Sequence, residues 1–181
     1  CTVSFSFSSM DYVSVTGDFS NELGRVGKKS FQLHLFKSIG AKGDIELADP
    51  QLKINADNGI GVSLEPDFTE VIAINPASGD RTQLVESNSA TPLRIDASSG
   101  KGKVQKSSIV LNSRNSNLPS FLSISPKTIE HNLGLSVASG TAPHTVHKGS
   151  ECDLSMQLEI PLEGKITSFE VLDTIDLQIT N

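Results

Sequence analysis

Apolar and polar residues alternate in short runs over residues 43–66, GDIELADPQLKINADNGIGVSLEP. This period of two turns one face of a β-strand toward a core and the other toward water. The runs are separated by Asp49-Pro50 and by Asn58-Gly59, and Asn-Gly tolerates the positive φ of a tight hairpin turn. The segment therefore predicts three β-strands, the last two joined as a hairpin.

The same alternation recurs along the rest of the 181 residues. Further strands are predicted at residues 3–7, 13–15, 31–36, 71–74, 84–85, 93–95, 109–111, 121–124, 129–137, 152–162 and 169–179. Residues 31–39 also fit the spacing of a short helix, although the alternation favours a strand. Many short strands separated by turn residues, without a long helix, predict an all-β fold. The expected architecture is an antiparallel β-sandwich, immunoglobulin-like, formed as a single domain over residues 1–181.

Polar stretches between the strands predict loops at Gly17–Lys29, Asn75–Ala90, Asn112–Pro119 and Ser139–Ser150. The last three are expected to carry variable contacts, because loops on a rigid scaffold often do so. The alternation continues almost to Asn181 without a polar or Gly-rich tail. We therefore expect residues 1–181 to be the N-terminal part of a longer protein.

Charge argues against one class of partner. The formal net charge is −6 and the pI is near 5.1, so the chain lacks the basic surface that displaces counterions from nucleic acid. Lys101, Lys103 and Lys106 form a local basic cluster, which we interpret as a solvated loop or a guard on a sheet edge. No apolar run approaches the ~18 residues that cross a membrane as a helix.

The two cysteines give indications about the cellular compartment of the protein and about its hydrophobic core. Cys1 is the first residue given, and secreted bacterial lipoproteins begin with a cysteine that carries the lipid. Cys1 is therefore predicted to be lipidated; the alternative is a disulfide between Cys1 and Cys152, which requires an oxidising compartment. Cys152 shares parity with five apolar residues in CDLSMQLEIPL, which predicts a buried thiol in the core.

Histidines are the first candidates for chemistry. His144 and His147 are two possible metal ligands, but they lie in a predicted loop with no acid between them and no accompanying Cys set. His131 falls on the apolar parity of its strand and is predicted to be a core or rim histidine. No metal site and no cofactor are predicted.

Acidic residues and motifs add no catalytic site. Asp44, Asp49 and Asp57 are spaced too irregularly for a calcium loop and are interpreted as turn formers. Asp173 and Asp176 are a possible acid pair of a glycosidase, but the solvent face of the last strand explains them better. No nucleophile elbow or P-loop motif occurs. Catalytic residues are therefore not predicted.

The chain resembles a family of secreted lipoproteins of the Bacteroidota from about Met10 to its end. The resemblance rests on the order of four phrases: DYVSVTGDF, IELADPQLKINADNGIGVSLEP, LNSRNSNLPSFLSISPKTIEH and LEIPLEGKITSFEVLDTIDL. Val62-Ser63 stand where Pro is common after the hydrophobic residue. Residues 58–65 also resemble the sandwich of late-embryogenesis-abundant and water-stress domains, more weakly. The family resemblance implies an exported, membrane-tethered β-sandwich without enzyme activity.

These observations together predict a non-enzymatic, lipid-anchored protein of the outer membrane or cell surface, held by Cys1. It would act as an interaction or accessory subunit, docked on an outer-membrane protein or on a component of an export or uptake complex. The alternatives are a cell-surface adhesin or glycan-binding module, and a hydrolase. Glycan binding is disfavoured because the chain has no Trp and a single Tyr, Tyr12, for stacking on sugars.

Overall fold

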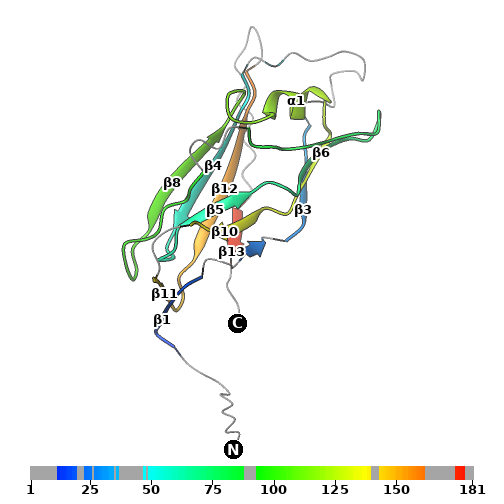
Figure 1. The fold of residues 1–181 in the computed structure, drawn as a ribbon. Coiled ribbons are helices and arrows are strands. Elements are labelled where there is room, and N and C mark those ends of the chain that lie inside the picture. The colour runs from blue at the N-terminus through cyan, green and yellow to red at the C-terminus, as the bar shows by residue number, and fades with distance from the viewer. Residues whose placement is uncertain are drawn as a thin grey trace, which may run out of the picture.

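The computed structural model describes residues 12–19, 23–25, 27–34, 36, 47, 49–87, 93–139, 143–161 and 174–177. Within this part of the chain the strands form four sheets in which every pair is antiparallel (Figure 1). One short helix, α1 (Leu118–Ser123), accompanies them, with Pro at its start, where a missing N–H costs nothing. The all-β fold of antiparallel sheets is confirmed.

The longest strands form a sheet with the order β13-β12-β4-β8. Its members are β4 (Gln51–Asn58), β8 (Gln105–Leu111), β12 (Cys152–Glu159) and β13 (Thr174–Leu177). Alternate residues of β12 are buried, as the period of two predicts. In β8, Ile109 and Leu111 are buried and Val110 between them is only partly buried, because β8 is an edge strand with one face on the core.

Two further sheets are joined end to end. Their orders are β2-β10-β5 and β3-β9-β6-β7. The strands are β2 (Leu23–Arg25), β3 (Lys29–Gln32), β5 (Leu64–Asp67), β6 (Val71–Asn75), β7 (Asp80–Gln83), β9 (Thr128–His131) and β10 (Gly134–Val137). Because β5 pairs with β10 and β6 with β9, residues 68–70 face residues 132–133. Residues 68–70 are one residue longer than the segment they face, and this extra residue interrupts the ladder as a β-bulge does. We call this place the bend.

A separate two-stranded ribbon consists of β1 (Ser14–Gly17) and β11 (His144–His147). The hydroxyl groups of Thr16 and Thr145 lie 2.8 Å apart across it. The ribbon rests on the turn after β4, where a side chain on Gly61 would overlap the carbonyl of Thr145. A two-stranded ribbon is marginal alone, so this contact helps to hold it.

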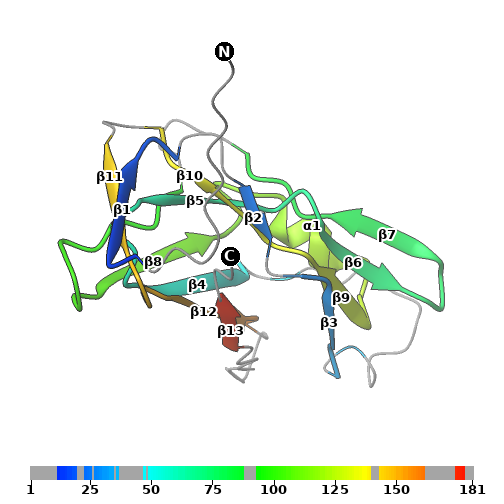
Figure 2. The ribbon, with the colours of Figure 1, turned by 90° about the horizontal axis from the view of Figure 1, so that it is seen from below.

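One hydrophobic cluster unites residues from β4, β5, β6, β8, α1, β9, β10 and β12. Figure 2 shows β5 and β10 passing over β4 and β8, and side chains from these strands belong to the cluster. Phe36, Phe68 and Phe121 are the buried phenylalanines of this core within the described residues. The fold is thus held by apolar side chains that alternate along paired strands.

The hairpin predicted at Asn58-Gly59 is wrong. β4 pairs with β12 and β8, whereas β5 pairs with β10. Neither Asn58 nor Gly59 adopts a positive φ. The Asn58 side chain instead accepts from the Ile60 N–H at 2.8 Å, which turns the chain out of one sheet into another.

Three predicted loops contain strands, so their boundaries were wrong. β2 lies within Gly17–Lys29, β7 within Asn75–Ala90 and β11 within Ser139–Ser150. These strands are short and largely polar, so no apolar alternation marks them, and pairing with a distant strand decides their conformation. Conversely, residues 121–124, predicted as a strand, belong mostly to α1.

Several other predictions can be placed on the structure. Residues 84–85 and 93–95 form no strand; Ile95 makes an isolated bridge to Leu64. Of the strand predicted at residues 31–36, only residues 31 and 32 belong to a strand, the end of β3 at Lys29–Gln32, whereas residues 33, 34 and 36 do not. The predicted strand at residues 3–7 and most of that at 169–179 lie outside the described residues, apart from β13.

Candidate functional site

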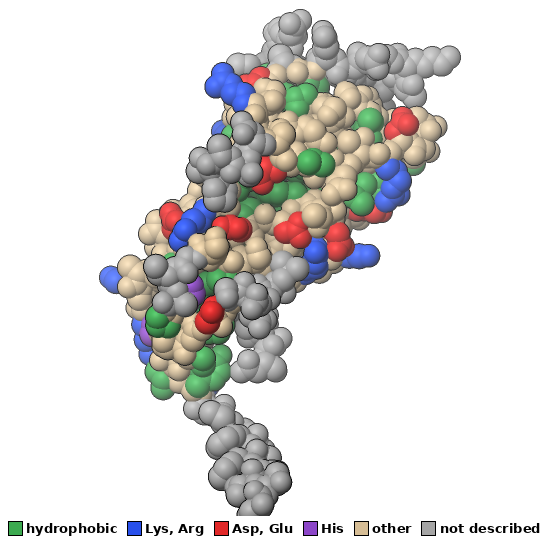
Figure 3. Space-filling model, viewed as in Figure 1, with side chains coloured by type: hydrophobic (Ala, Val, Ile, Leu, Met, Phe, Trp, Pro, Cys, Tyr) green, Lys and Arg blue, Asp and Glu red, His purple; other side chains and the backbone are tan. Residues whose placement is uncertain are grey.

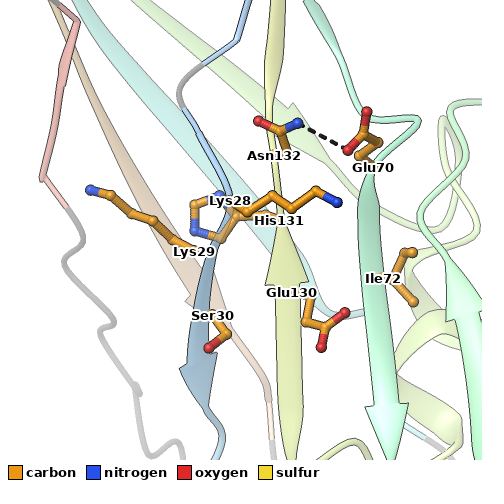
Figure 4. A pocket seen from close by; sticks show the side chains of 8 residues that line it. All are labelled: Lys28, Lys29, Ser30, Glu70, Ile72, Glu130, His131 and Asn132. Carbon is orange, nitrogen blue, oxygen red and sulfur yellow. Dashed lines mark hydrogen bonds between the residues drawn. The ribbon is translucent and has the colours of Figure 1, made fainter.

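A hollow of about 350 Å³ opens on the sheet β3-β9-β6-β7 beside the bend (Figure 4). Ser30, Glu130 and Ile72 face one another across β3, β9 and β6 in the strand register. The complete lining is Lys28, Lys29, Ser30, Glu70, Ile72, Glu130, His131 and Asn132. It mixes both signs of charge, since two lysines and two glutamates contribute to it.

Four polar residues from distant segments clamp the bend next to this hollow. Arg25 Nη2 lies 3.2 Å from Asp67 Oδ2, and Arg25 Nη1 lies 3.1 Å from Glu70 Oε1. Arg25 Nη1 also donates to the Asn132 carbonyl at 3.1 Å, and Asn132 Nδ2 donates to Glu70 Oε2 at 2.9 Å. The four side chains thereby tie β2, the β5–β6 segment and the β9–β10 segment together where the ladder is interrupted.

The surroundings of Asp67 in the clamp change the pKa of its carboxyl group. Partial burial raises its pKa, but the hydrogen bonds from the N–H and hydroxyl of Thr69 and the positive charge of Arg25 outweigh burial. The net result is a pKa below the ordinary 3.8. The clamp therefore favours the ionised carboxylate in the folded state.

Replacing Asp67 with Asn should lower the free energy of unfolding at pH 7 by about 1 kcal/mol, because the side chain is partly exposed. Since the folded-state pKa is depressed, this stabilisation is present above pH 3.8 and is lost as the pH falls through the lower folded-state value. Urea unfolding of wild type and Asp67→Asn from pH 7 to pH 2 measures the difference. Asp80→Asn, an exposed carboxylate in β7, is the control. A difference that persists unchanged to pH 2 would contradict the assignment.

His131 belongs to the core side of the hollow. It is 2% exposed, and its ring lies 6.0 Å from that of Phe31, tilted by 53°. The prediction of a core or rim histidine is confirmed, because the side chain is buried. His131 is also one of the residues that line the hollow.

The chemistry that the hollow offers is binding by charge and hydrogen bonds. Its two carboxylates hold strands together, Glu70 through Arg25 and Glu130 through Arg81 at 3.3 Å. Asn132 Oδ1 is buried and has no hydrogen-bond partner in the described part of the chain, so it can accept from a small polar molecule. Because both glutamates pair with arginines, they suit a structural role better than the role of a catalytic acid pair.

Cys152 is a free, fully buried thiol in β12, as predicted from its parity. Burial, followed by the nearby charges of Asp153 and Asp57, raises its pKa to about 11. The thiol is therefore protonated at neutral pH and shielded from reagents. Cys1, the predicted lipidation site, lies outside the described residues.

A bulky maleimide should leave Cys152 of the native protein unmodified at pH 7 and should modify it after unfolding in urea. With a pKa near 11, labelling should be at least about 100-fold slower than that of an exposed thiol. Peptide mass spectrometry measures the modified fraction over time. The matched control is Asp153→Cys in a Cys152→Ala background, because residue 153 is exposed on the same strand. Equal rates at the two positions would contradict the buried thiol.

The other candidate residues have structural placements. His144 and His147 lie in β11, not in a loop, and within the described residues no group of three or more His, Cys, Asp or Glu is placed to hold a metal. Asp49 adopts a positive φ of 42°, which confirms its role in a turn. Asp57 is not a turn former: it lies in β4 and pairs with Lys106 at 3.0 Å. Asp44 and Asp173 lie outside the described residues.

The lysine cluster has the placement expected of a guard on a sheet edge. Lys106 lies on the edge strand β8, whereas Lys101 and Lys103 are exposed in the segment before it. Side chains with a positive charge discourage another strand from adding to such an edge.

Asparagines of the loop at residues 112–117 occupy backbone groups at the edge strands β8 and β7. Asn115 Nδ2 donates to the Val110 carbonyl of β8 at 2.8 Å. Asn117 donates to the Gln83 carbonyl of β7 at 2.8 Å and accepts from the Val85 N–H at 2.7 Å. An amide side chain carries the donor and acceptor of a peptide group, so each occupies backbone groups that a further strand would use. This loop is therefore braced by its own asparagine side chains.

The clamp residues were not identified from the sequence. Arg25 lies in a predicted loop, and Asp67 follows a proline at the end of a strand. The one local signal is Asp67-Phe-Thr69, whose spacing suits an aspartate that accepts from the backbone two residues later. The remaining partners, Glu70 and Asn132, give no local signal because only the strand pairing brings them together.

Comparison with protein-family models, with curated proteins and with solved structures finds no match to this chain. No helix in the described ranges is long and apolar enough to span a membrane.

Proposed function

We propose that this protein is a non-enzymatic, exported β-sandwich, immunoglobulin-like in architecture, that is anchored to the outer membrane by a lipid on Cys1. It serves as an interaction or accessory subunit of an envelope complex, and its partner is an outer-membrane protein or a component of an export or uptake machine. Two observations support the sandwich architecture. Strands β4 and β12 each bury one face, and one hydrophobic cluster unites residues from the different sheets.

The observation that carries the proposal is the use made of buried polar side chains. Asn58, Ser63 and Asn75 are each 6% exposed or less. Asn75 Nδ2 donates to the Ile124 carbonyl at 2.9 Å, and Ser63 Oγ accepts from the Ala97 N–H at 3.0 Å. These groups brace loops. Buried polar side chains that hold loops in place favour a rigid scaffold over a site with reacting groups.

The proposed docking regions are exposed parts of strand β7 and its hairpin with β6. β7 is an edge strand, and Asp80, Arg81 and Gln83 are exposed. Figure 1 shows the β6–β7 hairpin extending away from the rest of the sheets. Its tip turns through Gly79, which has a φ of 82°. A protruding hairpin presents exposed side chains to a partner.

Lipid anchoring is tested by intact-mass analysis of protein purified from membranes. Wild type should carry acyl chains on Cys1, and Cys1→Ser should lose both the added mass and the membrane fraction. Cys152→Ala, the matched control, should keep both. An unmodified N-terminal peptide from membrane-purified wild type would refute the anchor.

Docking is tested separately by purification in mild detergent. A stoichiometric complex with an outer-membrane barrel or an export component supports the proposal. Replacing Arg81 and Gln83 with Glu, in a protein that still folds, should release the partner. A lone monomer at native abundance, with every envelope assembly intact after deletion of the gene, would refute it.

The hollow at the bend favours one second candidate, a glycan-binding or adhesin role. Its free acceptor, Asn132 Oδ1, and its lysines suit hydroxyl groups and acidic groups of a sugar. A glycan array with wild type and Asn132→Ala distinguishes the two roles. Hits that Asn132→Ala abolishes would support glycan binding, and an array without hits would leave docking as the function.

A further inference from the structure

Several segments distant in sequence meet at one end of the molecule, which we call the ribbon end. It consists of the β1–β11 ribbon, the turn at residues 58–62 and the turn at residues 99–104. A Cβ on Gly59 would lie 2.9 Å from the Glu151 carbonyl oxygen and 3.8 Å from that of Lys103, so the turns touch. The Gly59 N–H also donates to the Glu151 carbonyl at 2.8 Å. Figure 1 shows the ribbon and the start of β8 at the end opposite α1.

Exposed apolar side chains concentrate at the ribbon end. Val13, Val104 and Val15 are 70%, 58% and 43% exposed, whereas Val85, at 48%, lies next to Asn117 before helix α1. These four are the exposed large hydrophobic residues of the described chain. Figure 3 shows hydrophobic side chains at the lower end of the molecule, where β1 lies. A region where exposed apolar side chains gather is suited to contact with an apolar partner.

Charged residues accompany the valines without covering them. Lys101 and Lys103 are exposed in the turn, and Lys148 follows β11. Acidic residues are also present: Asp57 pairs with Lys106, and Glu151 and Asp153 are exposed. Lysines can lay their alkyl chains along an apolar surface and keep the ammonium in the headgroup layer of a bilayer.

The length of the connecting chain restricts which end of the protein faces the membrane. Ten residues, 2–11, separate Cys1 from Tyr12, the first described residue. Fully extended, the chain from Cys1 to Tyr12 spans at most roughly 40 Å. If Cys1 is acylated, Tyr12, two residues before the start of β1, must therefore lie within about that distance of the bilayer.

We propose that the ribbon end is the membrane-contacting surface of the anchored protein, with Val13, Val15 and Val104 in the headgroup layer. This proposal rests on the proposed acylation of Cys1. A lipid bilayer is the occupant because Val13 and Val15 lie on the segment that the anchor holds closest to the membrane, and Val104 lies directly before β8, whose start is at the same end. The end that carries α1 and the β6–β7 hairpin then points away from the membrane, toward the partner.

The absence of tryptophan from the sequence allows a clean test. Single-tryptophan variants Val13→Trp, Val15→Trp, Val104→Trp and Val85→Trp each carry one reporter. The purified proteins are coupled through Cys1 to vesicles that contain a maleimide lipid and brominated phosphatidylcholine. Peptide mass spectrometry confirms attachment at Cys1, and Cys152 is protected by burial.

The three reporters at the ribbon end should shift to the blue and lose fluorescence about twofold or more relative to vesicles without bromine, because bromine on the acyl chains quenches side chains buried in the interface. Val85→Trp, similar in exposure to Val15, should not change. Unquenched reporters at Val13 and Val15 in attached protein would overturn the proposal, as would equal quenching at Val85. Chemical coupling makes this outcome independent of native acylation, which the mass analysis of the cellular protein decides.

Discussion

Gly61→Ala should lower the free energy of unfolding by about 3 kcal/mol, at the upper end of the usual cost of overpacking. A methyl group at residue 61 would overlap the carbonyl oxygen of Thr145, a backbone atom that cannot rotate away. Either the turn after β4 or strand β11 must shift, and the ribbon loses the contact that holds it. The loss is measured by urea unfolding followed by circular dichroism.

Gly17→Ala is the matched control for this substitution. Gly17 lies in β1, in the same ribbon, and a Cβ there would have no atom within 4 Å. Its substitution should be neutral or should stabilise the protein by up to about 1 kcal/mol, since Ala restricts the unfolded chain. Hydrogen exchange should also show faster exchange of β11 amides in Gly61→Ala alone. If the two variants unfold at the same urea concentration, the proposed packing of Gly61 against β11 is wrong.

The need for Gly61 illustrates what the sequence could predict and what it could not. Alternation of apolar and polar residues located β4 and β12 closely, because each strand buries one face on the core. It did not identify β11, whose sequence His-Thr-Val-His has no apolar face. β11 is a strand because β1 pairs with it and because a glycine lets its backbone approach the turn.

Strand pairing is the second feature that could not be predicted from the sequence. Asn58-Gly59 has the composition of a hairpin turn, yet the strands on either side of it join different sheets. Local turn preference is weak compared with the burial gained when β4 pairs on both sides, with β12 and with β8. The clamp at the bend depends on the same long-range pairing, so Arg25 and Asn132 gave no local sign of meeting.

Burial of single residues was predictable wherever strand parity was clear. From parity alone, Cys152 was placed in the core and His131 in the core or at its rim, and they are 0% and 2% exposed. Strand parity does not predict, however, which polar side chains the fold buries. Asn58 falls on the same parity as Ala56 and is fully buried, and only its loop contacts explain why an amide occupies that position.

Asn58→Ala should be the most destabilising of the substitutions that remove side-chain atoms, at about 3–5 kcal/mol. The side chain is 0% exposed and makes three hydrogen bonds. Nδ2 donates to the carbonyls of Val62 at 3.0 Å and Asp96 at 2.8 Å, while Oδ1 accepts from the Ile60 N–H at 2.8 Å. Alanine would leave these three backbone groups without their partner, and each unsatisfied buried group costs about 1–3 kcal/mol.

Asn55→Ala is the control, because Asn55 lies on the exposed face of β4 and bonds only the Ser108 hydroxyl, at 2.9 Å, among the side-chain contacts of the described residues. It should cost less than about 1 kcal/mol. Asn58→Asp gives a second, independent measurement, because it keeps the acceptor for Ile60 but turns a carboxylate oxygen toward two carbonyls. That variant should be strongly destabilised at pH 7 and should recover stability as acid protonates the new carboxyl group, which can then donate to one carbonyl. If Asn58→Ala and Asn55→Ala unfold at the same urea concentration, Asn58 does not brace the passage from β4 into β5.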